Sequence, residues 1–466
     1  MFFFPHEYLF AILEKNFQKY KGGLPLISSS ALFRKPSQNH KSAPYELQDT
    51  PVKHRLYFLF MTSFFTLIAG FLFNTPSEIL EGLGRILTSP SILLTDYMAV
   101  GNIGSAFINS GLLMLLSIYL AIRSRTTPSG PLVAAVYTVG GFAFFGKNLY
   151  NVLPIMAGVL IYSRYQKEPF GKFILPALFG TALGPLVSQI SFGFEFSPLL
   201  GIALGTIAGI AAGFILPPLA HHFIRFHQGY NLYNIGFTAG IVGMLSMSIL
   251  RGFTLDNPRT AILLEEQSTG LTIYLVILFL SMIVYGYVTG HDLRRGLPIL
   301  FSRPGQLVSD FIASDGFAVT MVNMGLLGFI SMGYLLFAGG GLNGPIIGGI
   351  FTVVGFGAFG KHVKNVLPVM VGIYIANLLF QWEASSIGSL LAALFATTLA
   401  PVAGAYGIIP GIIAGFLHMA VVMNVGFLHG GMNLYNNGFS GGFVAAILVP
   451  VLDSLNIGKD KYEEER

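Results

Sequence analysis

A lysine that follows a glycine and precedes an asparagine by four residues occurs twice, each time within a long apolar stretch. The pattern F-G-K-x-x-x-N-V-L-P occupies Phe145–Pro154 and Phe359–Pro368. Glycine permits a sharp turn and proline disfavours helix at the preceding residue. Each motif therefore predicts a break between two half-helices that turns backbone amides and a positive helix end toward a solute. The residues expected to bind that solute are Lys147, Lys361, Asn151 and Asn365. The alternative is that each lysine extends from a short loop to the lipid headgroups.

A second repeated motif is rich in amide and hydroxyl side chains. The pattern N-L-Y-N-x-G-F-[TS]-x-G occupies Asn231–Gly240 and Asn433–Gly442. Such side chains can line a polar cavity or satisfy a broken helix; the alternative is helix–helix packing through small residues, with interhelical hydrogen bonds. The candidate solute contacts are Asn231, Tyr233, Asn234 and Thr238 in the first motif and Asn433, Tyr435, Asn436 and Ser440 in the second. His227 and His429 precede the motifs, and an interfacial position is favoured for them over proton or ion coupling.

Two aspartates and two asparagines form a third set of candidates. Asp96 and Asp310 each follow a hydroxyl residue and precede a helical run. This arrangement favours a helix N-cap, and the alternative is a carboxylate that takes up a proton or an ion for coupling. Asn109 and Asn323 lie inside the apolar stretches that follow, and they are better candidates to line a pore.

The elements that would hold these residues are membrane helices. The chain has 466 residues, of which 53% are hydrophobic and only 10% charged, whereas a soluble domain carries about 25% charged residues. Several apolar stretches reach the roughly 20 residues that cross a hydrocarbon core. The absence of cysteine excludes disulfides, thiolate metal sites and cysteine nucleophiles. The net charge of +5 does not indicate nucleic-acid binding, because lysine and arginine mark the cytoplasmic side of a membrane protein.

The second half of the chain repeats the first. One constant offset in numbering pairs Asp96 with Asp310 and also relates residues 138–158 to residues 352–372. The offset is shorter between the two N-L-Y-N motifs, so the first copy contains extra residues before its motif. Three ungapped blocks in the same order are not a chance match, so the chain contains two copies of one unit.

We predict an all-α integral membrane protein of two inverted repeats, each with five transmembrane helices and a re-entrant helical hairpin. Segments 130–163 and 344–381 are the hairpins, and the sequence leaves open whether each is re-entrant or spans twice. The expected spans are 56–73, 97–122, 173–190, 199–221 and 230–250, then 271–290, 316–338, 387–402, 407–428 and 433–453. The expected parts are a cytoplasmic segment 1–55, repeat 1 over 56–250, an external linker 251–270, repeat 2 over 271–453 and a cytoplasmic tail 454–466.

Loop charges indicate that the two copies face opposite ways. Segment 75–95 has a net charge of −1, and its counterpart 291–305 has a net charge of +2. The next loops reverse this pattern, since Arg123 and Arg125 correspond to the charge-free stretch 338–343. Cytoplasmic loops are enriched in lysine and arginine, so equivalent loops would lie on opposite sides of the membrane. We expect a protein of the cell membrane with both chain ends in the cytoplasm, on the plan of many transporters.

Motifs of common enzymes are absent or incomplete. Gly438–Gly441 matches the short G-x-S-G pattern of rhomboid proteases, but those enzymes need a histidine on a later helix and no histidine follows His429. The sequence also lacks H-E-x-x-H, G-x-x-x-x-G-K-[ST] and a G-x-G-x-x-G placed after a strand. We therefore expect no catalytic residues, no metal site, no cofactor and no ATP-driven pump.

Two resemblances add to these predictions. The repeat blocks resemble a prokaryotic family of membrane proteins known only as a domain of unknown function, over nearly the whole chain after residue 55. The doubled, inverted plan is also similar to that of urea transporters, in which two halves enclose a narrow pore and three protomers assemble. Gly229–Asn231 and Gly431–Asn433 are loosely similar to the Gly-Tyr-Asn-Gly element of that family, a resemblance that implies a homo-oligomer, in this case a trimer. A lysine at each hairpin tip departs from a pore for neutral urea and suggests an anion or a structural role.

The leading functional hypothesis is a transporter or channel for a small polar or anionic solute, with a path between the repeats near the bilayer midplane. Its partners would be the lipid bilayer and that solute, with no nucleic acid. Two other hypotheses stay open: a membrane enzyme that uses buried lysine, histidine and asparagine, and a membrane scaffold that transports nothing.

Overall fold

The computed structural model describes residues 50–257 and 261–457. Within these ranges the regular structure is helical, and the only extended pairings there are two isolated bridges. The all-α prediction is therefore confirmed. The expected segment 1–55 lies almost entirely outside the described residues, as does most of the expected tail 454–466.

Ten helical segments of the described residues are long and apolar enough to cross a membrane, and they coincide with the ten expected spans. Eight of them are α2 (Val52–Ala69), α5 (Ile103–Arg123), α10 (Pro198–Phe223), α11 (Asn234–Gly252), α12 (Thr269–Thr289), α15 (Phe317–Phe337), α20 (Ile408–His429) and α21 (Asn436–Ser454). Their length and composition make the chain a multi-pass membrane protein.

The other two spans are interrupted near their centres, which the sequence did not predict. They are α8 (Ile174–Phe179), the 3-10 turn η4 (Gly180–Leu183) and α9 (Gly184–Phe192), and α18 (Ile387–Ala396), the 3-10 turn η6 (Thr397–Leu399) and α19 (Ala400–Tyr406). Pro185 and Pro401 lie in the first turns of α9 and α19, where a missing N–H is tolerated. Each interruption frees backbone groups for contacts outside its own helix.

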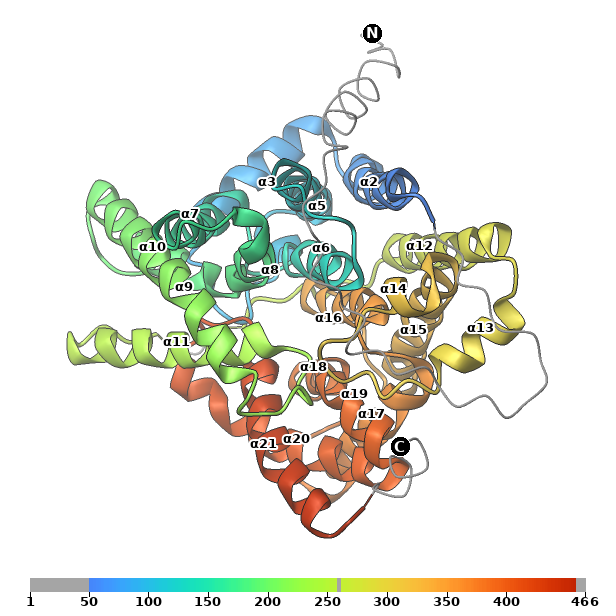
Figure 1. Cartoon of the computed structure of the whole chain (residues 1–466). Helices are drawn as coiled ribbons and strands as arrows, with labels where there is room; N and C mark the ends of the chain where they lie inside the picture. Colours follow the sequence, from blue (N-terminus) through green and yellow to red (C-terminus); the bar gives the residue numbers. More distant parts are fainter. Residues whose placement is uncertain (1–49, 258–260, 458–466) are drawn as a thin grey trace, which may run out of the picture. The chain divides into compact units, whose positions relative to one another are not determined.

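Each expected hairpin consists of two short helices joined by a turn. They are α6 (Gly130–Phe142) and α7 (Leu149–Tyr165) in the first copy, and α16 (Gly344–Gly355) and α17 (Val363–Leu379) in the second. Every residue of α6 and α16 is buried, and these two helices pack side by side (Figure 1). The helices α11 and α21 also pack together. The two copies therefore meet through equivalent helices.

The peripheral spans present apolar side chains outward. Along α12, Ile273, Ile277, Leu280 and Val284 are all exposed, at the spacing of one helix face. The helices α2, α10 and α20 also carry exposed large apolar residues. Such surfaces are expected where the surrounding medium is lipid.

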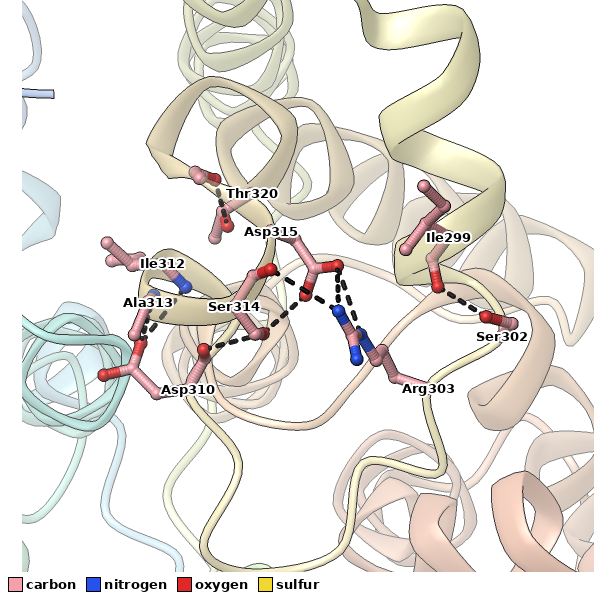
Figure 2. A network of polar contacts seen from close by, with 10 residues as sticks. Ile299, Ser302, Arg303, Asp310, Ile312, Ala313, Ser314, Asp315 and Thr320 are labelled. Carbon is pink, nitrogen blue, oxygen red and sulfur yellow. Dashed lines mark hydrogen bonds and ion pairs between the residues drawn. The ribbon is translucent and has the colours of Figure 1, made fainter. Parts of the chain in front are cut away.

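Short helices connect the first two spans of each copy. They are α3 (Pro76–Thr88) and α4 (Tyr97–Val100) in the first copy, and α13 (Leu293–Leu300) and α14 (Phe311–Asp315) in the second. A polar network fastens the second connection (Figure 2): the Arg303 guanidinium lies 3.2 Å from the buried Asp315 carboxylate, and Ser314 Oγ lies 2.6 Å from it. The first copy has Ser89 and Gly101 at the equivalent positions, so it cannot form this ion pair.

Candidate functional site

The lysine motifs form tight turns between the two helices of each hairpin. Gly146 follows α6 with φ +82°, and Gly360 follows α16 with φ +104°, a conformation that glycine adopts without strain. Asn151 accepts the backbone N–H of Asn148 at 2.9 Å and donates through Nδ2 to the Gly146 carbonyl at 2.9 Å. Asn365 makes the equivalent two bonds in the second copy. These asparagines therefore close the turns that carry the lysines.

Asn109 and Asn323 hold the same turns from the neighbouring spans. Asn109 Nδ2 donates to the carbonyl oxygens of Ala143 at 2.7 Å and of Lys147 at 2.8 Å. Asn323 Nδ2 donates to the two equivalent carbonyls of the second turn, both at 2.8 Å. Carbonyl groups past a helix end lack intrahelical partners, so the two asparagines satisfy them and fix the backbone of each lysine.

Both lysine side chains are fully buried and reach the opposite copy. Lys147 Nζ donates to the Tyr435 hydroxyl at 2.7 Å, while Lys361 Nζ donates to the Tyr233 hydroxyl and, at 2.7 Å, to Thr397 Oγ1. The two Nζ atoms lie 4.7 Å and 4.5 Å from the ring centres of these tyrosines, an attractive cation–π distance. No ion pair of the described residues involves either lysine.

Each tyrosine motif also forms a backbone hydrogen bond with the other copy. Leu232 N donates to the carbonyl of Thr398 in the interruption between α18 and α19, and Leu434 N donates to the carbonyl of Ala182 in the interruption between α8 and α9, both at 3.0 Å. Asn231 strengthens the first contact, because its Oδ1 accepts the Thr398 hydroxyl at 2.6 Å. Such reciprocal contacts are typical of halves related by a two-fold rotation.

A cavity of about 190 Å³ lies where the copies meet. Equivalent residues from both copies line it, namely Thr138 and Thr352, Phe142 and Phe356, Phe179 and Phe395, Leu232 and Leu434, Tyr233 and Tyr435, and Gly236 and Gly438. The lining also includes Leu307 and Val308, but not their counterparts Leu93 and Leu94. Because Val308 is 83% exposed, the cavity reaches the protein surface beside it.

The equivalent connection in the first copy is covered by residues that link the two copies. Ile262 N donates to the carbonyl of Leu94 at 3.0 Å, and Asp96 N donates to the carbonyl of Ile262 at 2.9 Å. Asn257 Nδ2 donates to the carbonyl of Gly430 at 2.8 Å. The two equivalent connections therefore differ. Linker residues bond to the first-copy connection at Leu94 and Asp96, whereas the cavity reaches the surface at the second-copy connection, beside Val308.

Asp96 and Asp310 are helix caps, as the sequence favoured. Asp96 accepts one amide of its own short helix α4 and Asp310 accepts two of α14, and each also accepts an amide from the other copy. Asp96 binds the Gly344 N–H at the start of α16 at 3.1 Å, and Asp310 binds the Gly130 N–H at the start of α6 at 2.9 Å. Burial raises the pKa of both carboxyl groups above the usual value, and the bound amides oppose that rise.

Asn234 lines the cavity with its polar atoms already engaged. Its Nδ2 donates to the carbonyl of Ala220 at 2.9 Å, and its Oδ1 lies 3.0 Å from His227 Nε2. Thr238 and Ser440 donate to carbonyls one turn earlier in their own helices, α11 and α21. The hydroxyl groups at these two positions are therefore used within the helices.

His429, Asn433 and Asn436 are buried around the second tyrosine motif. The His429 ring lies 4.7 Å from the Phe439 ring, and Asn433 Oδ1 accepts the Tyr435 N–H at 3.0 Å. Of all the predicted residues, the structure places Tyr233, Tyr435 and Asn234 in the cavity lining, with the two lysines against the tyrosine hydroxyls. The other predicted residues are not part of the lining.

The sequence analysis did not predict the apolar residues of the cavity lining, and it did not predict Thr397 as a hydrogen-bond partner of Lys361. Phe142 and Phe356 are aromatic residues in apolar helices, which look the same in a packed core. Their equivalence in the repeat was the available signal, because a cavity between two related copies must be lined by equivalent residues. Thr397 bonds to Lys361 because α18 ends there. The available signal for that interruption was Pro401, with Pro185 at the equivalent position of the first copy, because proline inside an apolar stretch breaks or kinks a helix.

The helices and the buried contacts define a membrane-embedded helical protein composed of two equivalent halves. The chain belongs to the family described as "Protein of unknown function (DUF1576)", whose model matches residues 75–252 and 289–454. These two stretches correspond to the two copies of the repeat, without their first spans. No curated protein and no solved structure matches the chain.

Proposed function

We propose that this protein is a transporter or channel that moves a small polar or anionic solute across the cell membrane. In this proposal the two copies are inverted relative to each other, both chain ends are cytoplasmic, and the solute passes unchanged between the copies. Lys147, Lys361 and the two N-L-Y-N motifs surround the point where the solute binds.

The observation that carries the proposal is the cavity between the copies. A membrane scaffold has no need for a cavity between its halves, yet equivalent residues of both copies line one here. Solute sites of transporters built from repeats lie at the repeat interface, next to discontinuous helices. Both kinds of discontinuity are present: the hairpin turns at Gly146 and Gly360, and the interruptions that precede α9 and α19.

Liposome flux with site-directed modification tests the proposal, and the chain suits it because it contains no cysteine. Purified protein in liposomes should pass at least one solute from a panel of small anions, amides and amino acids. In the variant Val308→Cys, a bulky thiol reagent should block that flux, because Val308 lies in the lining and at the surface. Leu455→Cys is the matched control, since Leu455 is 63% exposed and outside the lining. Folded protein with no flux for any solute contradicts the proposal.

The inverted orientation has its own test. Glu81 in α3 and Arg295 in α13 are equivalent positions of the two copies, and their side chains are 71% and 55% exposed. The single variants Glu81→Cys and Arg295→Cys should react with a membrane-impermeant maleimide from opposite sides of intact cells. With the positive side inside, the cysteine at position 81 should react from outside. Labelling of both from the same side contradicts the inversion.

A further inference from the structure

We propose that the cavity binds a small monoanion with an apolar body, such as a short branched or aromatic carboxylate. The anionic group would lie at the Tyr233 and Tyr435 hydroxyls, and Lys147 and Lys361 would supply the compensating positive charge. This inference rests on the proposed function and narrows its solute class.

The two lysines bonded to the tyrosines of the lining carry charge of one sign. Lys147 and Lys361 both bond to tyrosines of the lining, and the lining itself contains no aspartate or glutamate. The nearby carboxylates of Asp96 and Asp310 are committed to amide groups at the starts of α16 and α6. A buried ammonium without a carboxylate partner is costly, and a bound anion offsets that cost.

The tyrosine hydroxyls and lysine ammonium groups also have more hydrogen-bond donors than acceptors around them. Each tyrosine oxygen accepts a bond from a lysine Nζ, which leaves its own O–H to donate. A lysine ammonium carries three donors, and Lys147 has one hydrogen-bond partner among the described residues, where Lys361 has two. The amide oxygens in the lining do not meet this need, because Asn234 Oδ1 pairs with His227 and Asn437 Oδ1 with His418. A carboxylate brings acceptors and no donors.

The rest of the lining selects an apolar body of limited size. Phenylalanine and leucine side chains from both copies make up much of the wall, including Phe142, Phe356, Phe179, Phe395, Leu232 and Leu434. Burying such a wall against an apolar group is favourable by about 0.8 kcal/mol per CH₂. The volume of about 190 Å³ is below the range of about 300–1,000 Å³ typical of sites for drug-sized ligands. A solute of few heavy atoms fits these limits.

The test measures binding to the purified full-length protein by thermal unfolding and by titration calorimetry. Isovalerate, isovaleramide and isopentylamine serve as probes of nearly equal size that carry a negative, zero and positive charge, and acetate tests the need for an apolar body. We expect isovalerate to raise the unfolding midpoint with increasing concentration, and the amide and the amine to leave it unchanged. Acetate should bind at least tenfold more weakly than isovalerate.

Variants then assign the binding to the site. Lys147→Met combined with Lys361→Met should weaken isovalerate at least tenfold, while Lys364→Met, which removes an exposed lysine of the neighbouring helix turn, should not. If the double variant does not fold, Tyr233→Phe with Tyr435→Phe removes both hydroxyl donors and keeps the rings, and it should give the same loss. Equal binding of the amide, or undiminished binding to the tyrosine variant, overturns the inference. Flux of an amide or an amino acid, without binding of isovalerate, also overturns the inference and leaves the transport proposal standing. Isovalerate binding without any flux supports the inference and contradicts the transport proposal.

Discussion

The substitution Asn109→Ala tests how the lysine turn is held. Asn109 Nδ2 makes two buried hydrogen bonds, to the Ala143 and Lys147 carbonyls at 2.7 Å and 2.8 Å. Side-chain hydrogen bonds inside membrane proteins contribute about 0.6 kcal/mol on average and about 1.7 kcal/mol at most. Two such bonds give an expected loss of about 1 to 3 kcal/mol in the free energy of unfolding. Asn323→Ala should cost a similar amount, because its two bonds to the second turn are each 2.8 Å long.

The loss can be measured by equilibrium unfolding in mixed micelles titrated with a denaturing detergent. The matched control is Asn424→Ala, because Asn424 donates only to the Ala420 carbonyl of its own helix and is exposed. That control should change the free energy of unfolding by less than about 0.5 kcal/mol, the usual size for a surface substitution. If Asn109→Ala costs no more than Asn424→Ala, the turn does not depend on the asparagine.

Three further predictions use the same preparation. Asp96→Asn should lower the free energy of unfolding by about 1 to 3 kcal/mol, because amides donate to both carboxylate oxygens and asparagine keeps only one. Asp310→Asn should cost less, because all three amides donate to a single oxygen. Equal costs for the two substitutions would refute this reasoning. Gly130→Ala should cost about 1 to 3 kcal/mol through overpacking, because its Cβ would lie 2.1 Å from the Ala358 carbonyl oxygen, whereas Gly84→Ala in open space should cost nothing. Asp315→Asn should speed amide hydrogen exchange across residues 304–309, because it removes the partner of Arg303; unchanged exchange would show that the ion pair does not hold this connection.

The elements of the fold were largely predictable, because membrane helices depend on the length and polarity of single segments. The ten spans and the hairpins follow from apolar stretches and from the G-K-x-x-x-N motifs. The interruptions at Gly180–Leu183 and Thr397–Leu399 were not predictable in this way. Their sequences are apolar enough to continue a helix, and their 3-10 turns coincide with backbone contacts from the opposite copy.

The candidate site was predictable in its residues more than in its contacts. Comparison of the copies selected Lys147, Lys361, Tyr233 and Tyr435, which the structure brings together. It could not show which tyrosine meets which lysine, since both pairings are consistent with a repeat. The ion pair between Arg303 and Asp315 was missed for the opposite reason, because the first copy has no equivalent and the comparison provided no signal.

The exchange of tyrosines between the copies has a consequence for how this family evolves. Each lysine belongs to one half and its tyrosine partner to the other, across 288 residues for Lys147 and Tyr435 and 128 residues for Lys361 and Tyr233. Neither half contains a complete lysine–tyrosine pair, so both halves must be present before either pair can form. A change on one side of a lysine–tyrosine pair would therefore alter the constraint on a position in the other half of the chain.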